Sequence, residues 1–239
     1  MTSGIATTSP RAASRIAGFG YAIIFVLAIF ANFFVRQGLI DPDSAATTFA
    51  NIADSEFLFR AGMVSFLAVF IVDVVIAWAL YILFKSVNKE VSLLTAWFRL
   101  AYTVFLGVAL IFFFMVLDLV SGAAHLAAFE SGQLDANVTL LLNAFNYAWL
   151  IGLAGFGIHL MLLGYLMIGS GRAPKTLGIF LAIAGVAYVF DTLANTLVSS
   201  YMEYETIFLV IVAVPSVVAE LWFTVWLLTR GGAQQEAIQ

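Results

Sequence analysis

Four ionisable side chains lie within segments of this sequence that are otherwise apolar: Asp73, Arg99, His159 and Glu220. Carboxylate, guanidinium and imidazole groups can bind a proton, an ion or a polar solute, or they can neutralise one another in pairs. An unpaired charge at the centre of a membrane costs at least about 2.5 kcal/mol, so such side chains face the interior of a helix bundle. We therefore take these four residues as candidate ligand- or proton-binding residues.

The composition is typical of a membrane protein. The 239 residues are 63% hydrophobic and only 10% charged, whereas a soluble domain has about 25% charged residues. Cysteine is absent, which excludes disulfides, thiolate metal sites and cysteine nucleophiles. No basic run indicates nucleic acid, so the expected partner is the lipid bilayer, and the sequence leaves the oligomeric state open.

The apolar runs predict an all-α fold, a polytopic transmembrane bundle of six helices that occupies residues 15–230. Polar tails at residues 1–14 and 231–239 are expected to be disordered. A helix-start signal, Pro42-Asp43-Ser44, predicts a short surface helix in the longest connection. The expected spans are 17–35, 57–84, 91–120, 137–168, 175–198 and 206–228.

The distribution of basic residues predicts the orientation of the bundle, because short cytoplasmic loops are enriched in lysine and arginine. Arg36 is the one basic residue that the predicted topology assigns to a loop on the opposite side. Both termini are therefore expected in the cytoplasm. The basic residues on the predicted cytoplasmic side are Arg11, Arg15, Lys85, Lys89, Arg172, Lys175 and Arg230.

Counting along the helices places the four candidates at one depth. At about 1.5 Å per residue from the basic end, Asp73 lies roughly 18 Å deep, Arg99 roughly 13 Å, and His159 and Glu220 about 15 Å. We expect Asp73 to pair with Arg99, and His159 to lie beside Glu220. A histidine in such a position can change its charge near neutral pH.

Two further features concern the fourth and fifth spans. Ala148, Gly152, Gly155, His159 and Leu163 share one helical stripe, whose small residues favour close approach of a neighbouring helix in lipid. A secondary candidate group on one face of the fifth span consists of Tyr188, Asp191 and Asn195, with Asn143 or Asn146 of the fourth span as candidate partners.

Several chemistries are disfavoured by the motifs. His125 and His159 are predicted at different depths, so they do not form a shared metal or haem site. The sequence has no zinc-protease, serine-hydrolase, P-loop or dinucleotide-binding motif. We therefore predict no metal and no cofactor.

The chain resembles the bacterial domain-of-unknown-function 4386 family of six-span integral membrane proteins. The resemblance covers residues 15–231, with Ala219 as a minor departure where glycine is expected. It implies the fold and a multi-pass location in the bacterial plasma membrane, and it carries no activity. The matching stretches are Arg15-Ile-Ala-Gly-Phe-Gly-Tyr21, Phe59-Arg60-Ala-Gly-Met63, Ala77-Trp-Ala-Leu-Tyr81-Ile-Leu-Phe-Lys85, Phe98-Arg99-Leu-Ala-Tyr102, Gly155-Phe-Gly-Ile-His159, Pro174-Lys-Thr-Leu-Gly178 and Ala219-Glu220-Leu221.

Three functional classes fit these observations. The first is a binding site for a small solute, ion or proton in the inner half of the bundle, used in transport or sensing. The second is a structural or partner-binding membrane protein whose buried charges only hold the helices together. The third is an enzyme that uses His159 with Glu220 or Asp73 as acid and base. A solvent-reachable pocket at the polar layer would favour the first class, and dry packing the second.

Overall fold

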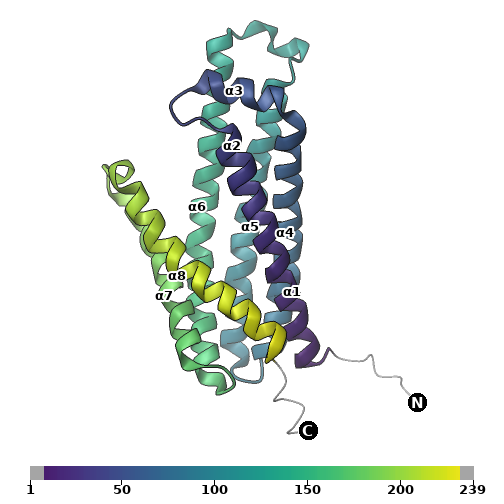
Figure 1. The fold of residues 1–239 in the computed structure, drawn as a ribbon, viewed down its shortest axis with the longest axis vertical. Helices are drawn as coiled ribbons and strands as arrows, with labels where there is room; N and C mark the ends of the chain where they lie inside the picture. Colours follow the sequence, from purple (N-terminus) through teal and green to yellow (C-terminus); the bar gives the residue numbers. More distant parts are fainter. Residues whose placement is uncertain (1–7, 232–239) are drawn as a thin grey trace, which may run out of the picture. The chain divides into compact units, whose positions relative to one another are not determined.

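The computed structural model describes residues 8–231, apart from the side chains of residues 125 and 131. The elements that it contains are helical (Figure 1). In chain order they are α1 (Pro10–Ile29), the π-helix η1 (Phe30–Arg36), α2 (Gln37–Leu39), α3 (Ala45–Asp54), α4 (Glu56–Phe84), α5 (Lys89–Val120), the 3₁₀ helix η2 (Ala124–Ala128), α6 (Ser131–Ser170), α7 (Lys175–Leu197) and α8 (Tyr201–Thr229).

Six helical segments of the described chain are long and apolar enough to cross a membrane, which confirms the predicted fold class. Each matches one expected span, and all but the fifth extend beyond it at one or both ends, because helix continues into the polar flanks. The segments are Pro10–Leu39, Glu56–Phe84, Lys89–Val120, Gly132–Ser170, Lys175–Leu197 and Tyr201–Thr229.

The first helix begins earlier than the sequence suggested. Residues 10–14 belong to α1, although the expected disordered tail extended to residue 14. Ser14 is buried, and its hydroxyl donates a 2.7 Å hydrogen bond to the carbonyl of Leu227 in α8. This contact gives the start of α1 a packing partner. Residues 1–7 and 232–239 of the two predicted tails lie outside the described residues.

The predicted surface helix is present as α3. The Ser44 hydroxyl accepts a 3.1 Å hydrogen bond from the backbone N–H of Thr47, which caps the first turn. Thr48 and Ile52 are buried on one face of this helix. At the other long connections, Gly122 and Gly171 adopt positive φ angles of 66° and 63°, a conformation that glycine tolerates without strain as the chain leaves a helix.

The chain folds into two compact units. Within the described residues, unit 1 contains residues 8–22, 73–101 and 153–231, and unit 2 contains residues 23–72 and 102–152. All seven candidate site residues belong to unit 1, so the geometry of that unit decides how they meet.

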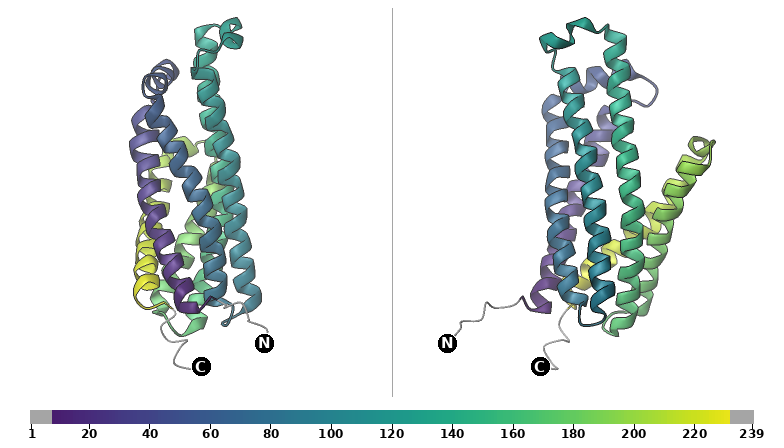
Figure 2. Two further views of the ribbon diagram at one scale, coloured as in Figure 1. Left: turned by 90° about the vertical axis from the view of Figure 1, so that its right-hand side faces the viewer. Right: turned by 180° about the vertical axis from the view of Figure 1, so that it is seen from behind.

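The helix ends within unit 1 gather on one side. The beginning of α1, the α4–α5 turn, the α6–α7 turn and the end of α8 lie together (Figure 1, Figure 2). The seven basic residues that predict the orientation lie at or near these ends. α7 and α8 pack along each other in the same unit (Figure 1).

Glycines bring α6 and α7 into backbone contact in unit 1. A Cβ atom built on Gly164 would lie 2.4 Å from the Gly178 carbonyl oxygen, and one built on Gly157 would lie 2.6 Å from that of Gly185. Any larger residue would push the helices apart, so these glycines allow the close packing of α6 against α7. On the predicted stripe, Gly152 instead approaches Phe105 of α5 within unit 2.

Unit 2 has an aromatic core. Phe113 stacks on Phe145 with ring centroids 3.9 Å apart, and Phe66 contacts both rings. Phe59 packs on Phe113 at 5.0 Å. These four phenylalanines are nearly inaccessible to solvent and are joined by aliphatic side chains from the same helices.

Candidate functional site

Arg99 of α5 is at the centre of a buried polar cluster in unit 1. Its Nη2 donates a 2.5 Å hydrogen bond to a carboxylate oxygen of Asp73 in α4, which makes an ion pair. Both residues are only 1% exposed. The predicted pair is therefore present, and charge-assisted hydrogen bonding offsets part of the cost of burying the two charges.

His159 of α6 joins the same cluster through both ring nitrogens. Nε2 lies 3.2 Å from Nη1 of Arg99, and Nδ1 lies 2.9 Å from the backbone carbonyl oxygen of Thr95. A guanidinium only donates and a carbonyl only accepts, so Nε2 must accept and Nδ1 must donate. The contacts therefore select the neutral Nδ1–H tautomer of His159, which is 0% exposed.

Two aromatic residues complete the surroundings of Arg99. Nη1 donates a 2.6 Å hydrogen bond to the Tyr21 hydroxyl of α1, and the guanidinium carbon lies 4.7 Å from the centre of that ring. The Phe156 ring lies 5.5 Å from the same carbon. Cation–π contacts of this kind add stabilisation when the cation is desolvated. Neither aromatic residue was among the predicted site residues.

Glu220 of α8 borders the cluster but has no direct partner in it. The side chain is partly buried and close enough to Arg99 and Asp73 to interact electrostatically with both. Among residues 8–231, no side chain or backbone group forms a hydrogen bond or ion pair with its carboxylate. The expected contact between Glu220 and His159 is therefore replaced by the Arg99 and Thr95 contacts of the imidazole.

Ser216 lies one helical turn before Glu220 on the same side of α8. It is 4% exposed, and among residues 8–231 no group lies in good hydrogen-bond geometry to its hydroxyl, although the Tyr188 hydroxyl is close by. Tyr188 of α7 is a polar neighbour of both Ser216 and Glu220. Pro215 has no N–H, so the carbonyl of Ile211 loses its usual helical partner. The Ser216 hydroxyl and the Glu220 carboxylate therefore lie together on one side of α8, next to Tyr188.

The secondary candidates are divided between two sets of contacts. Asp191 accepts a 2.7 Å hydrogen bond from the hydroxyl of Tyr201 in α8, and Asn195 is close to that hydroxyl. Tyr188 instead stacks edge-on against Phe156 at 5.5 Å. Asn146, a candidate partner of this group, makes its hydrogen bond with Arg36 in unit 2.

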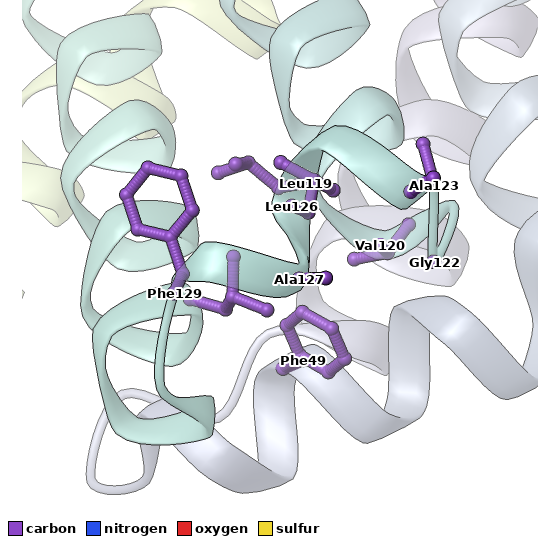
Figure 3. Close-up of a pocket in the computed structure, with 10 residues that line it drawn as sticks. Phe49, Leu119, Val120, Gly122, Ala123, Leu126, Ala127 and Phe129 are labelled. Atoms are coloured by element: carbon purple, nitrogen blue, oxygen red, sulfur yellow. The ribbon is translucent and has the colours of Figure 1, made fainter.

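A pocket of about 410 Å³ lies in unit 2, and it contains none of the candidate residues. Phe49 of α3 faces it from one side and the segment around Leu126 and Phe129 from the other (Figure 3). Its lining has no titratable side chain, so it offers apolar contact and no acid–base chemistry. The lining residues are Phe49, Leu119, Val120, Gly122, Ala123, Ala124, Leu126, Ala127, Phe129 and Leu134.

Comparison with known proteins supports the family resemblance noted in the sequence. An uncharacterized protein of Archaeoglobus fulgidus is 30% identical over 176 residues, which cover 74% of this chain and 87% of that protein. No solved structure matches the chain. The model of the family described as "Domain of unknown function (DUF4386)" matches residues 16–231, which include the whole polar cluster, and the chain belongs to this family.

Proposed function

We propose that unit 1 binds a proton or a small cation at Glu220, beside the Asp73–Arg99–His159 cluster, and that the protein uses this site in transport or sensing. The unpaired Glu220 carboxylate supports the proposal most directly. A carboxylate removed from water without a partner is unfavourable, so a positive charge that reaches it is bound favourably.

The charges of the cluster indicate that the ligand is positively charged. Asp73 and ionised Glu220 carry two negative charges, Arg99 carries one positive charge, and the hydrogen bonds of His159 select its neutral form. One negative charge is therefore in excess. A proton on Glu220 or a cation beside it makes the cluster neutral, whereas an anion would increase the imbalance.

The neighbouring oxygen atoms suit such a ligand. The Ser216 hydroxyl has no well-formed hydrogen bond among the described residues, and it lies one turn from Glu220 on α8, which contains Pro215. Carboxylate, hydroxyl and carbonyl oxygens are the donors that bind hard cations. A proton needs Glu220 alone, whereas a metal ion or ammonium-type ligand would also use Ser216.

The site is part of a proposed topology. We place both termini in the cytoplasm of a bacterial plasma membrane, with the basic helix ends of unit 1 on the cytoplasmic side. Glu220 then lies in the cytoplasmic half of its span, ten residues before Arg230, or about 15 Å along the helix.

Thermal unfolding of the purified full-length protein tests the proposal. We expect the unfolding midpoint of wild type to change with pH, or with added Na⁺, K⁺ or tetramethylammonium at constant ionic strength. The Glu220→Gln variant should lose this response. Glu90→Gln, which removes an exposed carboxylate from α5, is the matched control and should keep it. An identical response in wild type and Glu220→Gln would contradict the proposal.

A structural role is the second candidate, and one observation favours it. Asp73, Arg99 and His159 are closed to solvent, and Arg99 bonds directly to each of the other two, which is the dry packing expected of a purely structural contact between helices. In that case Glu220 contributes neither pH nor cation dependence, and the cluster only holds α4, α5 and α6 together. The unfolding experiment separates the two functions, because only a binding site gives a response that depends on Glu220.

A further inference from the structure

Arg36 of unit 2 carries a charge that its surroundings hold in place but do not neutralise. Its Nη1 donates a 2.8 Å hydrogen bond to the side-chain oxygen of Asn32, and its Nη2 donates to that of Asn146 in α6. The guanidinium carbon lies 5.0 Å from the centre of the Phe145 ring. All three neighbours are uncharged.

Arg36 also has an unused donor. Its Nε is buried and has no hydrogen-bond partner among residues 8–231. No carboxylate of the described chain forms an ion pair with it. A guanidinium that is partly removed from water usually has an anionic partner, because burying an unpaired charge is costly.

The backbone at this position is specialised. Arg36 ends the π-helix η1, in which the N–H of Gln37 bonds to the carbonyl of Asn32. The Asn32 amide nitrogen donates to the carbonyl of Ala28, which fixes the orientation of the side-chain oxygen that Arg36 uses. π-Helical turns inside α-helices occur frequently at functional sites.

The position along the span identifies the class of ligand. Arg36 lies three residues before the end of the first span at Leu39, or roughly 4.5 Å along the helix axis, which is the level of an interface. Phe33 and Phe34 beside it are exposed, as expected for side chains that face lipid. The anions present at that level in a bilayer are phosphate groups of lipid headgroups, and arginine binds phosphate with a forked geometry.

We propose that Arg36, oriented by Asn32 and Asn146, binds a phosphate group supplied by a lipid headgroup. This site lies in unit 2, and it shares no residue with the cation site proposed at Glu220. The bound phosphate accepts hydrogen bonds from the guanidinium and supplies the negative charge that the described protein residues do not.

The test measures phosphate binding with the full-length protein. Delipidated wild-type protein in neutral detergent is titrated with short-chain phosphatidylglycerol and, separately, with inorganic phosphate, and its unfolding midpoint is recorded. We expect phosphatidylglycerol to raise the midpoint. A rise with the lipid alone assigns the source to a headgroup, and a rise with both ligands assigns the site to phosphate of either source. No rise with either ligand overturns the proposal without the need for a variant.

Variants then assign the effect to Arg36. In native mass spectrometry, Arg36→Gln should retain at least about fivefold less phosphatidylglycerol than wild type. Arg36→Lys should retain an intermediate amount, because lysine keeps the positive charge but cannot donate two parallel hydrogen bonds to a phosphate. Arg60→Gln is the matched control, since Arg60 is exposed and already paired with Glu56. Equal lipid retention by Arg36→Gln and Arg60→Gln would overturn the assignment.

Discussion

Arg99 organises unit 1 by donating to three helices at once. Its guanidinium group donates hydrogen bonds to Asp73 on α4, Tyr21 on α1 and His159 on α6. A buried arginine with this many directed contacts specifies one arrangement of its neighbours. Glu220 of α8 is not one of these three hydrogen-bond partners.

The Asp73–Arg99 pair gives a prediction at the scale of single residues. Asp73→Asn or Arg99→Gln should each cost about 3–5 kcal/mol of stability, because the remaining charge stays buried without its partner. The double exchange, Asp73→Arg with Arg99→Asp, should recover part of that loss. The measurement is the fraction of monodisperse protein after heating, and an exchange no better than the worse single variant would contradict the pairing.

His159 gives a spectroscopic prediction. Nitrogen NMR of protein labelled at histidine should show the neutral Nδ1–H tautomer for His159, because Thr95 accepts from Nδ1 and Arg99 donates to Nε2. The His159→Gln variant identifies the signal. A spectrum with Nε2 protonated would mean that Arg99 does not donate to this ring.

The sequence predicted much of this cluster and missed part of it for a definable reason. Charges in apolar spans stand out, so Asp73, Arg99 and His159 could be found by depth alone. Tyr21 was missed because tyrosine is common in membrane spans, although it lies 11 residues, or about 16 Å, from the start of α1, within the same layer. The choice of partner for His159 depends on the rotation of α6, which a single sequence does not specify.

At the scale of elements, glycines let α6, which carries His159, pack backbone to backbone against α7. Gly164→Ala should lower stability by about 1–3 kcal/mol, because its new Cβ meets the backbone carbonyl of Gly178 and the helices must separate. Gly132→Ala, on the same helix with open space around it, is the control and should be nearly neutral. Equal effects of the two substitutions on the unfolding midpoint would argue against this contact.

The elements also show where periodicity is informative. Helix type and span number followed from apolar length, and the Ser44 cap predicted the start of α3. The prediction chose a different glycine face of α6 from the one that the structure uses. The predicted stripe contained Gly152 and Gly155, whereas Gly157 and Gly164 contact α7. Glycines lie on several faces of α6, and only the neighbouring helix decides which face is used.

For the whole molecule, the orientation is the prediction with the widest consequences. Reporter fusions after Lys89 and after Lys175 should both report a cytoplasmic location, because both follow turns that carry basic residues. A reporter signal from the opposite side at either site would invert the proposed topology. It would also place Glu220 in the other half of the membrane.

The central claim is that Glu220 binds a proton or a small cation, and infrared spectroscopy of the reconstituted protein tests it most directly. Wild type and Glu90→Gln should show a carboxyl band that changes when pH is varied or a small cation is added. Glu220→Gln should lack that change while keeping the helical amide bands. Identical difference spectra for wild type and Glu220→Gln would contradict the claim and leave the buried charges with a structural role.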